Sequence, residues 1–353
     1  MSTNDSLIAE TAERLFADAS TGEIARGAEA GRWPEALWDT VEAAGFADAL
    51  LLESGVSLSE AMTIVRIAAR HAAPIPLAET MIARLVLAGA GLAVPRGPLT
   101  IDANRASLGG LTVSRAANEW RLDGALQRVP FLRDTGRVLA HASTPSGPMI
   151  VIASIATAAL TLGRNLAGEP RDDARFTAHT LAPGQITRCP PTLDRDALYR
   201  WGALVRSAQI VGALEAALEM SVRYANDRVQ FGRPIGKFQA IQHQLALLGG
   251  EVAVSAAALD RAIEAQERDA PSAPLAIAAA KSRTSEAAGT AAAIAHQVHG
   301  AIGFTHEFAL QLLTRRLWSW RDEFGAEAEW NRVLGEAVMV RSEAGLWPAL
   351  AAL

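Results

Sequence analysis

Apolar residues recur at helical spacing through the first quarter of the chain. Farther along, Ser57 followed by Glu60 forms a capping box, which predicts a helix start, and Pro74 ends that helix. The residues that carry the helical pattern before it are Leu7, Ile8, Ala12, Leu15, Phe16, Leu37, Trp38, Val41 and Ala44. We therefore expect an N-terminal helical domain over residues 1–94.

The pattern changes to short β-rich runs separated by polar, Gly or Pro breaks. These runs cover residues 99–101, 111–113, 120–122, 138–140 and 149–153. They predict a small antiparallel β domain over residues 95–193, in which residues 183–191 read as a linker.

The helical period returns after Asp194. One long apolar stripe consists of Trp201, Leu204, Val205, Ala208, Val211, Leu214, Leu218 and Val222. Further helices are expected over residues 239–268 and 274–298, and a last one that includes 329–344. The short connections favour a four-helix bundle over residues 194–353. The predicted fold class is α+β, with helices, then strands, then a helical bundle.

The composition argues against several classes of protein. The chain has 353 residues and a net charge of −5, so it lacks the basic surface of a nucleic-acid-binding protein. Cys189 is its one cysteine, which leaves no intrachain disulfide. The polar start has no signal core, and the apolar run at 85–94 is too short to span a membrane. These features predict a cytoplasmic protein. Lysine occurs only at 237 and 281, a bias towards arginine that we attribute to genomic composition.

The segment that says most about function covers residues 224–248, YANDRVQFGRPIGKFQAIQHQLALL. It joins Arg228 to an aromatic residue, Phe231, and to a Gly-Arg-Pro turn that starts at Gly232. An arginine held beside a tight turn can bind a phosphate. Arg228 on its own is equally consistent with a solvated arginine at a helix C-terminus.

A second segment reads Gln-Val-His-Gly-Ala-Ile-Gly-Phe over residues 297–304. Gly300 and Gly303 would let main-chain amides approach an anion, although Gly300 alone could be an ordinary helix C-cap. His296 and His299 have the spacing of a metal pair but lack a carboxylate partner, which favours a structural role or one beside a cofactor.

Together the two segments resemble the acyl-CoA dehydrogenase family, and the resemblance covers nearly the whole chain. In the first segment the matching residues are Gln230, Phe231, Gly232, Pro234, Ile235, Phe238, Gln239, Gln242, Leu245 and Ala246. In the second, Gln297, Gly300 and Gly303 match the family's Gln-x-x-Gly-x-x-Gly loop. No Gly-x-Gly-x-x-Gly fingerprint follows a strand, which argues against NAD.

The resemblance implies FAD as the cofactor. It assigns Arg228 to the FAD pyrophosphate and the Gln297 loop to the ADP part, across a subunit interface. The implied cofactor-binding set is Arg228, Gln230, Phe231, Gln297, Gly300 and Gly303.

The sequence departs from the family at the catalytic base. Gly325 stands where many members carry the glutamate, and the alternative position on the first bundle helix holds Gly202 or Ala203. Glu323 and Glu327 flank the first position and are candidate bases, or they are solvated surface carboxylates. The middle domain also lacks the family's Thr-Glu-Pro-x-x-Gly-Ser and Trp-x-(Ser/Thr) segments.

This pattern resembles the shorter subunit of heteromeric bacterial acyl-CoA dehydrogenases of steroid side-chain breakdown. It implies α,β-dehydrogenation of an acyl-CoA in a tetramer, a dimer of dimers, with the base on a partner chain. Electron-transfer flavoprotein would be the electron acceptor. Two alternatives stay open: a self-sufficient homo-oligomer that uses Glu323 or Glu327, and a non-catalytic homologue that binds no flavin.

Overall fold

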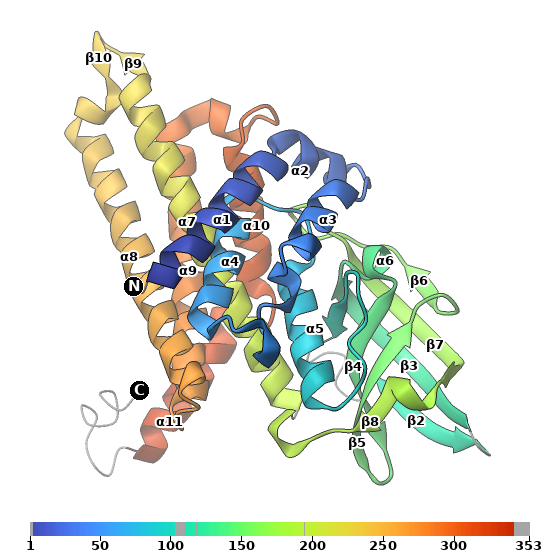
Figure 1. Cartoon of the computed structure of the whole chain (residues 1–353). Coiled ribbons are helices and arrows are strands. Elements are labelled where there is room, and N and C mark those ends of the chain that lie inside the picture. The colour runs from blue at the N-terminus through green and yellow to red at the C-terminus, as the bar shows by residue number, and fades with distance from the viewer. Residues whose placement is uncertain (1–2, 103–109, 117–118, 194, 342–353) are drawn as a thin grey trace. The chain divides into compact units, whose positions relative to one another are not determined.

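The computed structural model describes residues 3–102, 110–116, 119–193 and 195–341. Helices come first, strands follow, and helices return, which confirms the predicted α+β class (Figure 1). The α-helices are α1 Thr3–Ala19, α2 Gly22–Glu29, α3 Glu35–Ala43, α4 Leu58–Arg70, α5 Leu77–Gly89, α6 Leu132–Thr135, α7 Arg195–Asp227, α8 Gln239–Glu267, α9 Ala273–His299, α10 Leu310–Asp322 and α11 Glu327–Arg341. The strands are β1 Thr100–Asp102, β2 Leu111–Ala116, β3 Glu119–Pro130, β4 Arg137–Thr144, β5 Gly147–Ser154, β6 Ala159–Thr161, β7 Arg171–Leu181, β8 Ile186–Arg188, β9 Val229–Gln230 and β10 Arg233–Pro234.

The chain divides into two compact units that cut across its linear order. One unit comprises residues 1–25, 58–73 and 203–353, and the other comprises residues 26–57 and 74–202. The expected boundaries near residues 94 and 193 follow the change from helix to strand and back, and they stay a prediction about domains.

The sheet of the second unit is mixed, which corrects the expectation of an antiparallel domain. Its strand order is β6-β7-β3-β2-β4-β5-β8, and β1 pairs with β4. Both β1 and β2 run parallel to β4. A three-residue strand such as β1 contains too little pattern to reveal its direction. Residues 183–191, expected as a linker, contain β8, which pairs with β5 along residues 149–151.

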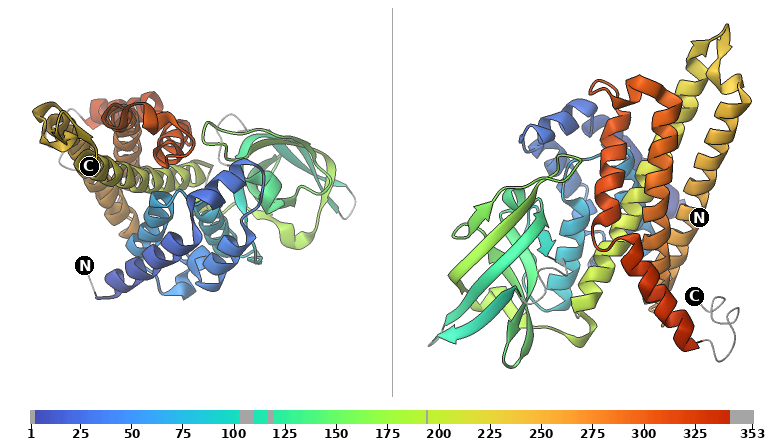
Figure 2. Two further views of the ribbon diagram at one scale, coloured as in Figure 1. Left: turned by 90° about the horizontal axis from the view of Figure 1, so that it is seen from above. Right: turned by 180° about the vertical axis from the view of Figure 1, so that it is seen from behind.

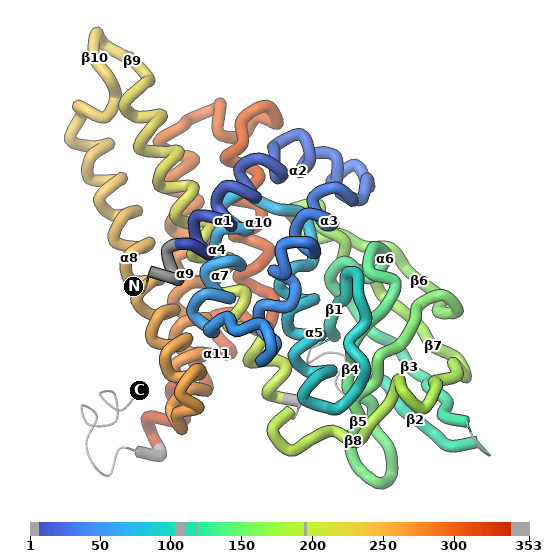
Figure 3. Tube along the Cα trace, in the orientation of Figure 1, coloured from blue at the N-terminus to red at the C-terminus, as the bar shows by residue number. Residues whose placement is uncertain are grey.

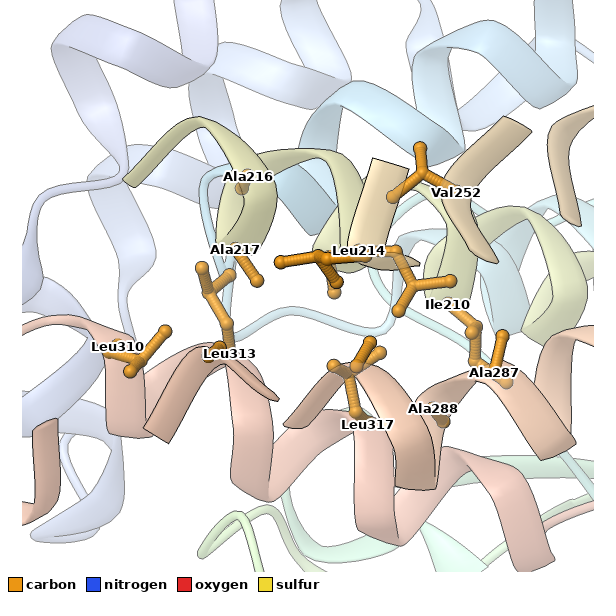
Figure 4. Close-up of a cluster of buried hydrophobic side chains, with 14 of the residues drawn as sticks. Ile210, Leu214, Ala216, Ala217, Val252, Ala287, Ala288, Leu310, Leu313 and Leu317 are labelled. Atoms are coloured by element: carbon orange, nitrogen blue, oxygen red, sulfur yellow. The ribbon is translucent and has the colours of Figure 1, made fainter. Parts of the chain in front are cut away.

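The first unit is a helical bundle with a small-residue core. Ile210 and Leu214 of α7 pack against Ala287 and Ala288 of α9 and Leu317 of α10 (Figure 4). Alanine along α9 lets the neighbouring helices approach closely, and α9 contacts α8, α10 and α11. Seen from behind, the orange and red helices of this group lie side by side (Figure 2). α9 is therefore the central helix of the bundle.

A hairpin joins α7 to α8 at one end of this bundle (Figure 3). Antiparallel β9 and β10 form it, with Gln230 opposite Arg233 and Val229 opposite Pro234. Among the described residues, no helix combines the length and apolarity needed to cross a membrane.

Candidate functional site

The hairpin turn holds a phenylalanine in an unfavourable backbone conformation. Phe231 has φ 51° and Gly232 has φ 77°, so both central residues of the turn are left-handed, as in a type I′ turn. This conformation costs a residue with a Cβ about 1–2 kcal/mol. The Phe231 side chain is nonetheless 92% exposed, so burial of its ring does not offset that strain. The ring contacts Phe238 edge-to-face at 6.2 Å and otherwise lies open to solvent, where it is available to a ligand.

Arg228 has a fixed main chain and an exposed side chain. Its amide donates to the Tyr224 carbonyl and its carbonyl accepts from the Ile235 amide, both at 2.8 Å. Within the part of the chain that the structure describes, its guanidinium has no ion-pair partner. The neighbouring Arg233 guanidinium lies 4.2 Å from the Phe238 ring centroid. Arg228 is thus a positioned cation with donors directed to solvent, which suits an anionic ligand.

The end of α9 forms the second candidate segment, and its glycines serve different purposes. Gly300 ends the helix with φ 64° and ψ −146°, a conformation almost confined to glycine, and is exposed. Gly303 is buried, and a Cβ there would lie 3.0 Å from the His299 Cβ and 3.2 Å from His296 Nδ1. Gly303 therefore shapes the loop through close packing, while Gln297 and Gly300 face solvent.

The two histidines belong to the packing of this loop. The His296 ring stacks on Phe304 at 4.1 Å and its Nε2 lies 2.9 Å from Thr314 Oγ1. His299 Nδ1 lies 2.8 Å from the Ala295 carbonyl. Burial lowers the pKa of both, so the neutral form is favoured. No cluster of three potential metal ligands exists among the described side chains.

A ring stack brings the two segments together. The Tyr224 ring, one turn before Arg228, stacks on His299 at 4.6 Å and 27°. Phe308 packs against both rings, at 6.1 Å from Tyr224 and 5.1 Å from His299. The end of α7 and the end of α9 therefore form one surface, although 69 residues separate Arg228 from Gln297 in sequence.

The candidate bases lie farther back along α9, where Lys281 donates to the Arg321 and Gly325 carbonyls. Arg206, which is 1% exposed, binds Glu323 Oε2 through Nε and Nη2, both at 2.9 Å. Glu327 pairs with Arg321. Each carboxylate is thus engaged by a guanidinium. Figure 1 shows the β9–β10 hairpin and α11 at opposite ends of the bundle.

Comparisons with known proteins identify the family. Residues 198–327 match the family model described as acyl-CoA dehydrogenase, C-terminal domain. Acyl-CoA dehydrogenase IpdE2 of Mycobacterium tuberculosis is 30% identical over 317 residues, which cover 88% of this chain and 89% of that protein.

The chain belongs to the acyl-CoA dehydrogenase family.

Solved structures agree with this acyl-CoA dehydrogenase fold. The Tcur3481-Tcur3483 steroid ACAD, as a point variant, has a TM-score of 0.85 at 23% identity, covering 97% of this chain and 99% of that one. The ChsE4-ChsE5 complex from Mycobacterium tuberculosis has a TM-score of 0.87 at 19% identity, covering 96% and 98%. At these identities the likeness concerns the fold.

Acyl-CoA dehydrogenases are FAD-dependent, and the exposed hairpin surface fits that cofactor. Arg228 and the Gln297 amide are solvent-facing donors, and the exposed Gly300 leaves the main chain accessible to a ligand. The sequence indicated these residues but missed Arg206 and Lys281, which contact residues 321–325. The signal for Lys281 was present: it is one of two lysines in an arginine-rich chain.

Proposed function

We propose that this chain is a subunit of an acyl-CoA dehydrogenase assembly and supplies the ADP-side part of a FAD site shared with a partner chain. Arg228, Gln230 and Phe231 would bind it from the hairpin, and Gln297 with Gly300 from the end of α9. Gly303 would keep the loop in shape. One observation carries the proposal: both segments form a single exposed surface, while the carboxylates near Gly325 lie farther back along α9, beside Lys281.

The proposed reaction is α,β-dehydrogenation of an acyl-CoA thioester, with bound FAD as hydride acceptor. A base must reach the α-proton. Glu323 and Glu327 are both held by arginines, and Gly325 has no side chain. We therefore place the base on the partner chain of a heteromeric tetramer. A steroid-derived acyl-CoA is the first substrate class to test, and electron-transfer flavoprotein the first acceptor.

The FAD assignment is tested with Arg228→Ala in the complex formed with a co-expressed acyl-CoA dehydrogenase subunit. A charged hydrogen bond to phosphate is worth about 1.5–3 kcal/mol, which is about tenfold to a hundredfold in Kd. We expect lower flavin absorbance per complex and weaker FAD binding in a fluorescence titration. Arg223→Ala is the matched control, because Arg223 is 67% exposed on the same helix and pairs with Glu219.

The outcomes separate the alternatives. Unchanged FAD binding in Arg228→Ala would remove the assigned role of Arg228. A complex without flavin would favour the non-catalytic homologue. A stoichiometric flavin and acyl-CoA turnover by the chain purified alone would show that it needs no partner.

A further inference from the structure

Lys281 is a fully buried lysine in the middle of α9. Its side chain is 0% exposed, and its amino group lies within hydrogen-bond distance of three oxygen atoms. The acceptors are Ser285 Oγ at 2.8 Å, the Arg321 carbonyl at 2.7 Å and the Gly325 carbonyl at 2.8 Å. Two of them are main-chain groups, one directly before and one at the end of the turn at residues 322–325, which begins at the last residue of α10. Lys281 thus connects both ends of this turn to the central helix.

The three acceptors explain why a lysine stands here. An ammonium is compact and directs three donors along divergent bonds, whereas a guanidinium is a planar fork that suits paired oxygens. In a chain that otherwise uses arginine almost throughout, this position retains lysine. The geometry of the site therefore suits a lysine, which the general composition bias does not explain.

Other side chains hold the same turn from different helices. Phe324 has φ 54°, and the Arg206 guanidinium lies 5.3 Å from its ring centroid while pairing with Glu323. The Trp330 indole of α11 donates to the Phe324 carbonyl at 2.9 Å. The strained main chain at Phe324 is thus fixed by contacts from three helices, α7, α9 and α11.

We propose that Lys281 is a positioning residue, which fixes the turn at residues 322–325 through its hydrogen bonds to the Arg321 and Gly325 carbonyls, and that turnover by the assembled enzyme depends on this geometry. The catalytic part of this inference rests on the proposed function. The structural part, a turn held in one conformation by Lys281, does not.

The proposal separates two roles along one helix. Lys281 lies sixteen residues before Gln297 in α9, or about 24 Å of helix at 1.5 Å per residue. Loss of Lys281 should therefore impair turnover without releasing FAD, whereas loss of Arg228 should release FAD. No general loss of stability produces this pair of effects.

The test compares Lys281→Met, Lys281→Arg and Ser285→Ala in the co-purified complex. Flavin content, kcat, KM and amide hydrogen exchange over residues 321–327 are measured. For Lys281→Met we expect faster exchange at the turn, unchanged flavin content and KM, and a kcat lowered by about 10- to 100-fold, as for other misplaced catalytic geometry. Lys281→Arg should not restore kcat. Ser285→Ala should have a smaller effect, because both carbonyl contacts of Lys281 remain.

Ile64→Ala is the control for stability alone. Ile64 is buried on α4, a helix that carries none of the turn residues, and its truncation removes a core contact. It should lower the melting temperature and leave kcat and turn exchange unchanged. If Lys281→Met does not fold, Lys281→Gln is measured instead, because its amide keeps two donors on a side chain that is shorter by one bond.

The inference is overturned if Lys281→Met keeps the wild-type kcat and the wild-type exchange at the turn. It is also overturned if Ile64→Ala loses kcat to the same extent. If the wild-type complex contains no flavin, the proposed function fails, and hydrogen exchange alone then decides whether Lys281 positions the turn.

Discussion

The burial of Lys281 predicts a specific pH dependence of stability. Desolvation lowers the pKa of Lys281 from 10.5 to about 7, although the carboxylates of Glu327, Glu323 and Asp322 oppose the shift. The Arg206 guanidinium adds to it. Between these two pKa values the unfolded chain binds a proton that the folded chain does not. Stability should therefore rise with pH across this window and fall as pH decreases towards 7.

The size of this pH dependence is set by the one proton that the unfolded chain binds and the folded chain does not. The free energy of unfolding changes by at most about 1.4 kcal/mol per pH unit when the two states differ by one bound proton. For a chain of this size, that corresponds to roughly 2 °C in Tm per pH unit. Lys281→Met removes the titrating group from both states. The Tm of the wild type should therefore rise with pH relative to the Tm of the variant.

The assay is thermal unfolding of both proteins from about pH 7.5 to 9.5, a range inside the window. The difference in Tm between them is plotted against pH, so that other titrating groups cancel. Lys237→Met, which replaces the other lysine at an exposed position, should run parallel to the wild type. Parallel curves for the wild type and Lys281→Met would refute the reasoning, because Lys281 would then keep its proton in the folded chain.

Two further predictions concern the hairpin and the candidate base. Phe231→Asn places Asn-Gly in a type I′ turn, so we expect thermal stability to be kept or raised by up to about 1 kcal/mol; FAD binding should weaken, and unchanged binding would show that the ring has no cofactor role. Glu323→Gln removes the counter-charge of buried Arg206, which should cost about 3–5 kcal/mol in unfolding experiments. The folded complex should still turn over acyl-CoA, and complete loss of turnover would make Glu323 the base.

The helical parts of the fold could be predicted because their signals are local. The helices expected over residues 239–268 and 274–298 are observed as Gln239–Glu267 and Ala273–His299. Pro271 and Pro274 separate them, and proline marks helix boundaries directly in the sequence.

The sheet was harder to predict from the sequence, because the longest strand that the prediction omitted begins with charged residues. β7 begins Arg-Asp-Asp, which reads as a solvated loop, yet the Asp172 side chain is fully buried against Arg133. Charged residues are rarely buried unless paired, and the partner lies 39 residues away. A sequence pattern that compares only neighbouring residues cannot predict the pairing of Asp172 with Arg133.

The candidate site also combines local features, which the sequence indicates, with contacts between distant residues, which it does not. The turn at Phe231 and Gly232 and the glycine loop after Gln297 are local features, and the sequence indicated both. The Tyr224–His299 stack that joins them depends on how α7 meets α9. The ion pair of Glu323 with Arg206 spans 117 residues. Glu323 therefore looked like an available carboxylate until the fold placed an arginine against it.

The geometry of α9 gives the strongest reason to expect a shared cofactor. Its end carries the Gln297 loop, and its middle holds the turn at residues 322–325, about 24 Å of helix away. If the hairpin surface binds the ADP end of one FAD, we expect the turn on the same chain to act at a different copy of the cofactor. A complex in which Arg228→Ala on this chain weakens flavin binding, while the partner's own residues provide the base, is the arrangement that this separation favours.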